Sequence, residues 1–367
     1  MILHKYLRIL FVPLFFMSAH SALATTYAVG SCLPKLVSFT GIQAAVNAVP
    51  PGSKIEVCPG TYYEQVTIAR PLTLEGVVSG NAARAVVAVP VFAGLQPNVT
   101  STVTGVWTYY FAQFAAQVLV QTPGPVNITD ITVDGAGANL GCSTSLEWLA
   151  GIFYASGSSG TVNRVTTRNQ LDQSCGNGIW VEGAPNQTVT IENSSVHDFD
   201  YAGIFVGTAG YDSWLTTPIK GNSVYGAGGT YGIETFFVTG TVKSNVVTGG
   251  PIGIFNQSGP TLLTTISNNT VADVGTGITT GWEQGSTVKS NKISNTSTGI
   301  DLQAIGITAN SNTITKTAIA IEFECDTDNV AGNIINDSQV AYDRFPGTIA
   351  PAGTLLNVDA VLGGSCP

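Results

Sequence analysis

Residues 264–278, TTISNNTVADVGTGI, and residues 286–300, STVKSNKISNTSTGI, are two copies of one pattern. Each copy contains an Asn, then any residue, then Val or Ile, and each copy ends in Gly-Ile. The Asn motif, with one Ser in its place, begins at Asn163, Ser194, Asn222, Asn245, Asn269, Asn291, Asn312 and Asn333. The successive spacings are 31, 28, 23, 24, 22, 21 and 21 residues. Repetition at 20 to 30 residues indicates a solenoid, in which each unit buries its apolar face against its neighbours.

The residues inside each repeat indicate short strands. Segments such as Thr241-Val242-Lys243 and Ile300-Asp301-Leu302 alternate apolar and polar residues and then meet Gly, Asn or Ser. Leucine-rich repeats have a similar period, but they need several Leu per unit and a helical half, and this chain has neither. We therefore expect an all-β fold, a single right-handed parallel β-helix of about 10–12 coils. Its aligned Asn residues should hydrogen-bond to one another and to the turns.

The start of the repeat region predicts a cap. In Thr40–Val49 the residues Ile42, Ala45, Val46 and Val49 share one helical face, and Thr40 with Gln43 matches a capping box. We expect this helix to cover the first coil, whose strands are Lys54–Val57, Val66–Ile68 and Leu72–Leu74.

The predicted organisation has four parts, because the repeat leaves no room for a second globular domain. These parts are a signal peptide at 1–24, an N-terminal cap at 25–53, the β-helix at 54–350 and a disulfide-tied tail at 351–367, with an irregular excursion inside 78–125.

The N-terminal residues are typical of a secretory signal. His4, Lys5 and Arg8 precede an apolar run, and Ala22-Leu23-Ala24 is a small-residue cleavage site. We expect a secreted or periplasmic protein with no membrane-spanning segment after cleavage; the alternative is a retained N-terminal anchor. Without this segment, 12 bases would face 23 acids, a net charge of −11.

Composition excludes several classes of protein. The chain of 367 residues is 44% hydrophobic and 10% charged, which disagrees with disorder and with a coiled coil. Its net charge of −9 argues against nucleic acid as a partner. We expect a monomer.

Six cysteines in an exported chain predict disulfides, because the compartment is oxidising. No Cys-x-x-Cys pair is present, so a zinc ribbon or a redox motif has no support. Fifteen connectivities are possible for six cysteines. We favour nearest-neighbour pairing, Cys32–Cys58, Cys142–Cys175 and Cys325–Cys366.

Residues 40–76 resemble the opening of pectin-lyase-like right-handed β-helix proteins. The resemblance lies in TGIQAAVNAV at 40–49, PGSKIEVCPGTYYE at 51–64 and PLTLEG at 71–76. It implies the fold much more firmly than an activity, since the superfamily includes pectinesterases, pectate lyases, polygalacturonases and alginate epimerases. The catalytic signatures of pectinesterases, epimerases and polygalacturonases are absent here. The resemblance therefore leaves open whether the protein is an enzyme; if it is, we expect a polysaccharide lyase, glycoside hydrolase or epimerase.

The strongest cluster of chemically active residues lies in adjacent predicted coils between residues 164 and 214. Together they could supply a general acid and base, and they include His197, a residue type commonly used for both roles. The alternative is a set of solvated turn residues. The catalytic candidates are Arg168, Asp172, Glu182, His197, Asp198 and Asp200.

The residues that follow each Gly-Ile predict a ligand-binding face. If each Ile points inward, the next residue points outward. Aromatic rings stack on sugars while carboxylates bind sugar hydroxyls, so this column favours a polysaccharide or cell-surface glycan; the alternative is a stack that packs beneath loops. The substrate-binding candidates are Phe153, Trp180, Phe205, Glu234, Phe255 and Asp301, with Trp282 beside them.

Two further sets of charges lie on predicted strands. Glu322, Glu324, Asp326 and Asp328 alternate with apolar residues and could bind Ca²⁺, although a solvated acidic patch is the alternative. Lys220, Lys243 and Lys289 each precede a repeat Asn by two residues and form an outward column. It is typical of solvated lysines that discourage aggregation, with a track for a polyanion as the alternative.

Two functions follow from these features. The first is an exported β-helix that binds a polysaccharide along an outer sheet face, with or without cleaving or modifying it. The second is a non-catalytic structural or adhesive surface protein built on the same rod.

Overall fold

The computed structural model describes eleven parts of the chain. They are residues 25–78, 84–103, 112–142, 147–185, 187–208, 216–226, 228–257, 259, 263–323, 329–344 and 352–363, with only the backbone described at 282–284, 304, 305, 344 and 352–363. Several predictions lie outside these residues: the signal peptide, Glu324, Asp326, Asp328 and the Cys325–Cys366 disulfide. The side chain of Trp282 is also outside them.

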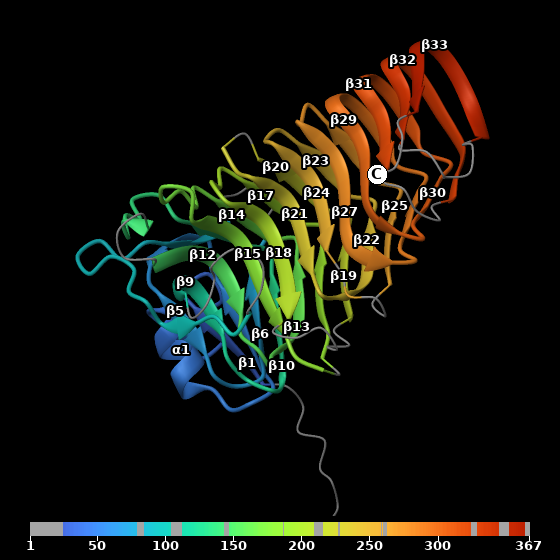
Figure 1. Ribbon diagram of the computed structural model, residues 1–367. Helices are drawn as coiled ribbons and strands as arrows, with labels where there is room; N and C mark the ends of the chain where they lie inside the picture. Colours follow the sequence, from blue (N-terminus) through green and yellow to red (C-terminus); the bar gives the residue numbers. More distant parts are fainter. Residues whose placement is uncertain are drawn as a thin grey trace, which may run out of the picture.

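The chain winds into a right-handed parallel β-helix, as the repeat predicts (Figure 1). Each coil contributes strands to three parallel sheets. Sheet 1 is the ladder β5 Val66–Ile68, β9 Gln113–Val120, β12 Glu147–Tyr154, β15 Gly176–Gly183, β18 Ala202–Thr208, β21 Tyr231–Phe236, β24 Ile252–Gln257 and β27 Thr276–Gln284.

Sheets 2 and 3 follow the same stacking. Sheet 2 is β1 Thr26–Val29, β3 Ser53–Val57, β6 Leu72–Gly76, β10 Pro125–Thr129, β13 Ser159–Asn163, β16 Val189–Glu192, β19 Thr216–Lys220, β22 Thr239–Lys243, β25 Thr264–Ser267, β28 Thr287–Lys289 and β30 Thr308–Asn310. Sheet 3 is β4 Gly60–Tyr63, β7 Ala85–Ala88, β11 Ile131–Asp134, β14 Thr166–Arg168, β17 Ser195–His197, β20 Ser223–Tyr225, β23 Val246–Thr248 and β26 Thr270–Ala272. Two short strands, β2 Ser38–Phe39 and β8 Val99–Thr100, lie at the edges.

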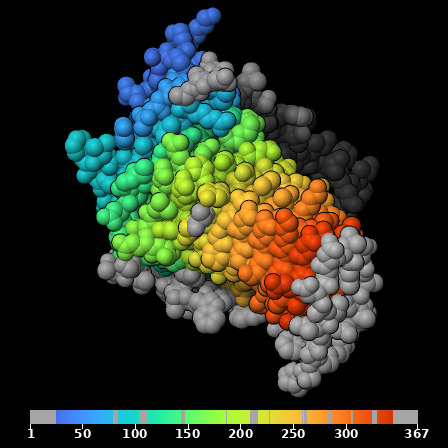
Figure 2. All heavy atoms as spheres, turned by 90° about the horizontal axis from the view of Figure 1, so that it is seen from above, coloured from blue at the N-terminus to red at the C-terminus, as the bar shows by residue number. Residues whose placement is uncertain are grey.

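The last coils have long strands that bend from one sheet into another. These are β29 Lys292–Ile305, β31 Thr313–Phe323, β32 Asn329–Arg344 and β33 Ala352–Gly363. β33 pairs in parallel with β32, so residues 352–363 continue the solenoid, whereas we expected a tail from residue 351. In Figure 2 the coils follow one another as successive bands of colour from the N-terminus onward.

The Asn ladder lies at the turn between sheets 2 and 3. The backbone N–H and the Nδ2 of Asn245 both donate to Oδ1 of Asn269, at 2.9 and 3.0 Å. The same two bonds connect Asn222 to Asn245, Asn269 to Asn291, Asn291 to Asn312 and Asn312 to Asn333. The buried polar atoms of these turns are thereby satisfied, which allows the turns to stack without water.

The residue before each ladder position has the left-handed backbone conformation. Its φ lies between 50° and 66° at Asn193, Gly221, Ser244, Asn268, Ser290, Ser311 and Gly332. Gly and Asn adopt this conformation at little cost, which explains why Gly, Asn and Ser occupy the position.

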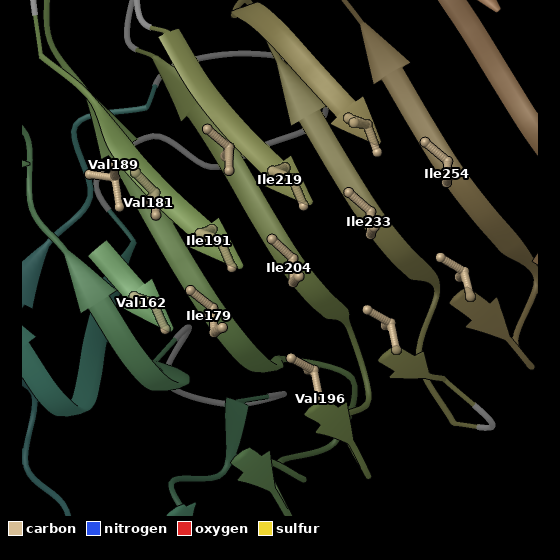
Figure 3. Packing of buried hydrophobic residues seen from close by; sticks show 14 of the residues in the cluster. Val162, Ile179, Val181, Val189, Ile191, Val196, Ile204, Ile219, Ile233 and Ile254 are labelled. Carbon is tan, nitrogen blue, oxygen red and sulfur yellow. The ribbon is translucent and has the colours of Figure 1, made fainter. Parts of the chain in front are cut away.

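The interior of the coil is apolar and ordered in columns. Ile179, Ile204, Ile233 and Ile254 occupy equivalent positions of β15, β18, β21 and β24 and are fully buried (Figure 3). Since each Ile packs on the Ile of the next coil, no single repeat could form this core alone.

Helix α1, Ile42–Ala48, covers the first coil, with Ile42, Ala45 and Val46 buried. The predicted capping box does not form, since its N-terminal residue is Gly41 and no side chain there makes a capping bond. Instead, Glu64 accepts hydrogen bonds from the backbone N–H groups of Ile42 at 2.9 Å and Gln43 at 2.7 Å. Glu64 belongs to the first coil, so this bond fastens the cap to the solenoid.

Two of the predicted disulfides are confirmed, Cys32–Cys58 and Cys142–Cys175. Within the described residues, α1 is too short to cross a membrane and no longer apolar helix is found.

Candidate functional site

The outward residues of sheet 1 form the predicted column. The strand register places Phe153, Trp180, Phe205, Glu234, Phe255, Thr279 and Asp301 beside one another in seven consecutive coils. Neighbouring members are therefore separated by about 4.8 Å, the spacing of adjacent strands.

The first three members of this column are covered, contrary to the expectation of an open groove. Phe153, Trp180 and Phe205 are 0%, 3% and 4% exposed. The rings of Trp180 and Phe205 stack with centroids 3.7 Å apart. They belong to a second apolar cluster outside the coil, which includes Val103, Phe114, Trp148 and the Cys142–Cys175 disulfide. These three aromatics pack beneath loops, so they cannot contact a ligand in this conformation.

Glu182 connects sheet 1 to the covering segment at Ser101 and Thr102. It is buried and accepts hydrogen bonds from the Ser101 hydroxyl and from the backbone and hydroxyl of Thr102, at 2.9 and 2.8 Å. Trp180 Nε1 donates to it as well, at 3.2 Å. A carboxylate with this many donors is satisfied where it is, which favours an anchoring role over proton transfer.

The column becomes partly exposed at Phe255, directly after the buried Glu234. Phe255 is half-buried, and its ring centroid lies 5.3 Å from that of Tyr231. The ring centroid of Tyr231 lies 5.6 Å from that of Tyr201, and both tyrosines are half-buried. These three rings give the outer face of β18, β21 and β24 a partly accessible aromatic surface.

Glu234 lies between Phe205 and Phe255 and is the most unusual group on this surface. It is 7% exposed, and its Oε2 has no hydrogen-bond partner within the described part of the chain. Burial raises its pKa to about 8, while a hydrogen bond from Tyr201 lowers it in part. Glu234 is therefore largely protonated at neutral pH and can act as a hydrogen-bond or proton donor.

The interior directly behind this surface is polar. Thr235, Asn256 and Thr280 are buried at positions where the coils before and after have Val206 and Leu302. Thr235 and Asn256 hydrogen-bond to each other at 2.5 Å. Polar residues in an otherwise apolar core break the pattern of the solenoid, and such breaks concentrate at functional sites.

Acidic residues continue the column beyond Thr279. Asp301, Glu322 and Asp343 follow one another in register. Burial and the nearby Asp343 carboxylate raise the pKa of Glu322. Across the described residues no group of three possible ligands has the geometry to hold a metal ion. Of the four predicted Ca²⁺ ligands only Glu322 is described.

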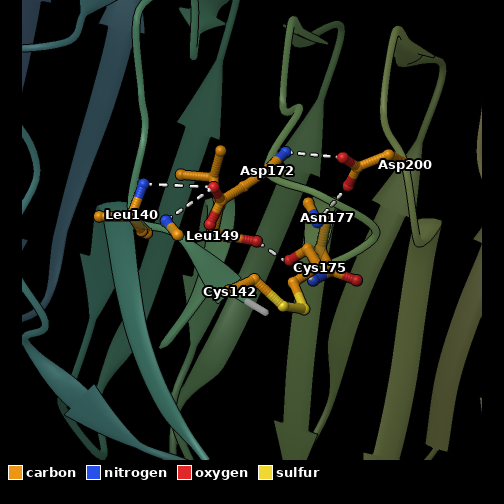
Figure 4. Close-up of a disulfide and its surroundings, with 9 residues drawn as sticks. Leu140, Cys142, Leu149, Asp172, Cys175, Asn177 and Asp200 are labelled. Atoms are coloured by element: carbon orange, nitrogen blue, oxygen red, sulfur yellow. Dashed lines mark hydrogen bonds between the residues drawn. A yellow bond between two sulfur atoms is a disulfide. The ribbon is translucent and has the colours of Figure 1, made fainter. Parts of the chain in front are cut away.

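The catalytic candidates do not converge. Asp172 and Asp200 lie in the turns before sheet 1 and organise those turns (Figure 4). Asp200 accepts from the backbone N–H groups of Asp172 and Gly176, and Asp172 accepts from those of Leu140 and Gly141. These bonds hold the loop that the Cys142–Cys175 disulfide also crosses.

The remaining candidates lie on sheet 3. Arg168 Nε pairs with Asp134 at 2.8 Å, and His197 Nδ1 contacts Asp198 at 2.7 Å on a partly exposed turn. Glu182 faces outward from sheet 1, so the six residues are distributed over two sheets and a set of turns.

The tyrosines of the site were missed in the sequence. Tyr201 and Tyr231 precede the Gly-Ile motifs of their coils by two residues and one residue, respectively. The predicted face uses only the residue after each Gly-Ile motif, whereas the outward positions on both sides of the motif contribute to one face.

Two hollows lie away from this surface. One of about 440 Å³ includes Asn98, Thr100 and Gln113 in its lining. Another of about 250 Å³ is lined by Glu56, Glu75 and Asp130 among others. Lys54 pairs with Glu56 and Glu75, and Arg164 pairs with Asp130, so each carboxylate of the second hollow has an ion-pair partner, although two cations offset three carboxylates.

Comparison with known proteins identifies the fold. No family of sequences and no curated protein matches the chain. The A-module of the mannuronan C-5 epimerase AlgE4 from Azotobacter vinelandii is similar with a TM-score of 0.64 and 16% identity, over 89% of this chain and 95% of that one. The AlgE6 A-module from the same organism gives 0.55 and 17%, over 89% and 94%.

A tailspike protein of Escherichia coli bacteriophage HK620, solved with a pentasaccharide, gives a TM-score of 0.55 and 12% identity. The match covers 85% of this chain and 60% of the tailspike chain. All three have the right-handed parallel β-helix fold, which confirms the fold expected for a pectin-lyase-like protein.

Proposed function

We propose that the protein binds a polysaccharide on the outer face of sheet 1, over β18, β21, β24 and β27. Phe255, Tyr231 and Tyr201 would supply apolar surface for the sugar rings, while Glu234 and Asp301 would bind hydroxyl groups. The proposal no longer includes Phe153, Trp180 and Phe205 as direct contacts, because they are covered.

One observation carries the proposal: Oε2 of Glu234 is buried among half-exposed aromatic rings and has no hydrogen-bond partner among the described residues. Leaving a buried polar atom unpaired costs about 1–3 kcal/mol. This atom is itself buried, so a ligand would reach it only when the side chains around it move. The half-exposed rings of Phe255, Tyr231 and Tyr201 beside it give a face suited to a polar ligand with flat apolar faces, such as a sugar.

The structural neighbours support the same ligand class at the level of the fold. Two of them are epimerases of mannuronan and one holds a pentasaccharide. Identities of 12–17% transfer no residue roles, so the assignment of residues depends on the surface of this chain alone.

Modification of the polysaccharide is the further part of the proposal. A protonated Glu234 could donate a proton to a leaving group or neutralise a developing charge, with Tyr201 orienting it. Asp301 lies three coils from Glu234, about 14 Å along the column, which is too far for a pair of glycosidase carboxylates. These two residues are therefore disfavoured as the catalytic pair of a glycosidase.

Dependence of the activity on Ca²⁺ is a separate proposal.

The second candidate is a structural or adhesive rod. The packed aromatic stack of Phe153, Trp180 and Phe205 favours it, since this stack stabilises the coils without contacting any ligand.

We also propose that the protein is exported to the periplasm or the cell exterior. The Cys32–Cys58 and Cys142–Cys175 disulfides support this, because disulfides persist in oxidising compartments.

Binding of the purified protein to uronate and neutral polysaccharides, with and without Ca²⁺, tests the proposal. We expect Phe255→Ala and Glu234→Ala each to weaken binding about tenfold or more, the effect of losing roughly 1.4 kcal/mol. Tyr225→Ala is the matched control, because Tyr225 is an exposed aromatic residue on sheet 3 and its loss should change nothing. Equal losses for all three variants, or no binding by the unaltered protein, would favour the structural rod.

A further inference from the structure

Three lysines form a column on the outer face of sheet 2. The register places Lys220 directly beside Lys243, and Lys289 follows two coils after Lys243, with Ser267 between them. All three lysines are exposed. Lys220 forms an ion pair with Glu192 of the preceding coil at 2.8 Å, so one end of the column is partly compensated.

From β19 to β30 this face is polar and has no acidic residue, whereas toward the N-terminus the same column continues into Glu192, Glu75 and Glu56. The strands β19, β22, β25, β28 and β30 have the sequences TTPIK, TGTVK, TTIS, TVK and TAN. Thr241, Thr265, Thr287 and Thr308 form a second column, two residues before the positions of the lysine column. Over five coils the face thus carries hydroxyls and ammonium groups in a chain whose net charge is −9.

Placing lysines beside one another on neighbouring strands costs free energy through repulsion, and packing of the core does not require this arrangement. Like charges directly opposite each other on neighbouring strands destabilise a sheet. Lys220 and Lys243 are such a pair, and these strands offer no carboxylate beside Lys243 to offset it. Solubility alone would be served by lysines and acids in alternation.

We propose that this face, defined by Lys220, Lys243, Lys289 and the adjacent threonine column, binds a linear acidic polysaccharide that carries carboxylates on its sugars. Adjacent coils are about 4.8 Å apart, so the lysines repeat along the rod at one and two strand spacings. An extended polymer lying along the rod can present a carboxylate at each lysine while its hydroxyls reach the threonines. The threonine hydroxyls both donate and accept, which suits sugar hydroxyls.

A nucleic acid fits this face less well. Its phosphates are dense, and three lysines on an acidic protein would compensate few of them against long-range repulsion. A polyuronate has lower charge density and more hydroxyl groups, so it matches a face that is mostly threonine.

This surface is separate from the one around Glu234, because it lies on sheet 2 and not on sheet 1. The two proposals therefore fail independently: loss of binding on substitution of the lysines alone concerns this face, and loss on substitution of Phe255 or Glu234 concerns the other.

The test is a binding titration of the full-length protein with polygalacturonate, unsubstituted dextran and single-stranded DNA at rising salt concentrations. We compare the unaltered protein, the variant Lys220→Ala/Lys243→Ala/Lys289→Ala, and the control Lys35→Ala/Lys292→Ala/Lys316→Ala, which removes three exposed lysines elsewhere. Unchanged circular dichroism and thermal unfolding would show that both variants are folded.

We expect polygalacturonate binding to weaken with salt and to fall about tenfold in the first variant only, since each exposed ion pair contributes modestly. Equal affinity of the unaltered protein and the first variant would overturn the proposal. So would equal losses in both variants, preference for DNA, or binding to dextran that equals binding to polygalacturonate.

Discussion

At the scale of single residues, the asparagines between sheets 2 and 3 hydrogen-bond each coil to the next. Each interior member accepts two hydrogen bonds through Oδ1 and donates two through Nδ2, one to the next Asn and one to a strand carbonyl, as Asn269 does to Val242 at 2.9 Å. A hydrophobic residue of similar size could fill the space but could not satisfy the N–H of the coil before it.

Asn269→Ala should therefore destabilise the protein by about 3 kcal/mol, because it leaves the buried N–H of Asn245 unpaired and removes three other bonds. Urea unfolding followed by circular dichroism measures the change. The exposed Lys292→Ala serves as the control, with an expected change within about 0.5 kcal/mol. Equal effects of the two substitutions would contradict the stabilising role of the ladder.

Glu234 predicts a dependence of stability on pH. Its pKa is about 8 when folded and near 4.5 when exposed, so the folded state binds the proton more tightly. The stabilisation is complete below pH 4.5 and is lost as the pH rises through the interval up to about 8, by at most about 1.4 kcal/mol per pH unit. Unfolding of the unaltered protein and of Glu234→Gln across pH 5–9 measures it. The difference between them should change across this range; a constant difference would show that Glu234 titrates normally.

At the scale of elements, the cap and the excursion show how distant carboxylates hold irregular segments. Glu64 binds the start of α1, Glu182 holds the segment at Ser101 and Thr102, and Asp172 and Asp200 fix successive turns. The sequence suggests catalytic roles for Glu182, Asp172 and Asp200. A structural carboxylate and a catalytic one are the same residue type, and they differ only in the hydrogen-bond donors that surround them in the fold.

Replacement of Glu64 tests the element scale. Glu64→Ala removes the acceptor of two backbone N–H groups at the start of α1, and we expect a loss of about 1–2 kcal/mol. Amide hydrogen exchange at Ile42 and Gln43 should accelerate, while Glu64→Gln should retain part of the protection. Unchanged exchange in Glu64→Ala would mean that the helix start does not depend on this residue.

At the scale of the whole molecule, the repeat decided most of what could be predicted. Because one register relates all coils, Asn245 and Asn269 could be aligned from spacing alone, and the outward column from Phe153 to Asp301 followed directly. Residues outside the repeat could not be placed in this way. The excursion that buries Phe153, Trp180 and Phe205 has no period, so the sequence could not reveal which part of the column it covers.

The most direct test of the account is the titration of Glu234 itself, by NMR of protein labelled with ¹³C at glutamate carboxyls and assigned with Glu234→Gln. We predict a carboxyl that titrates near pH 8 in the free protein and whose signal shifts saturably when a bound polysaccharide reaches it. The assignment of this face as the binding site would be contradicted by a Glu234 carboxyl that titrates near pH 4.5 and whose chemical shift does not change with any polysaccharide that the protein binds.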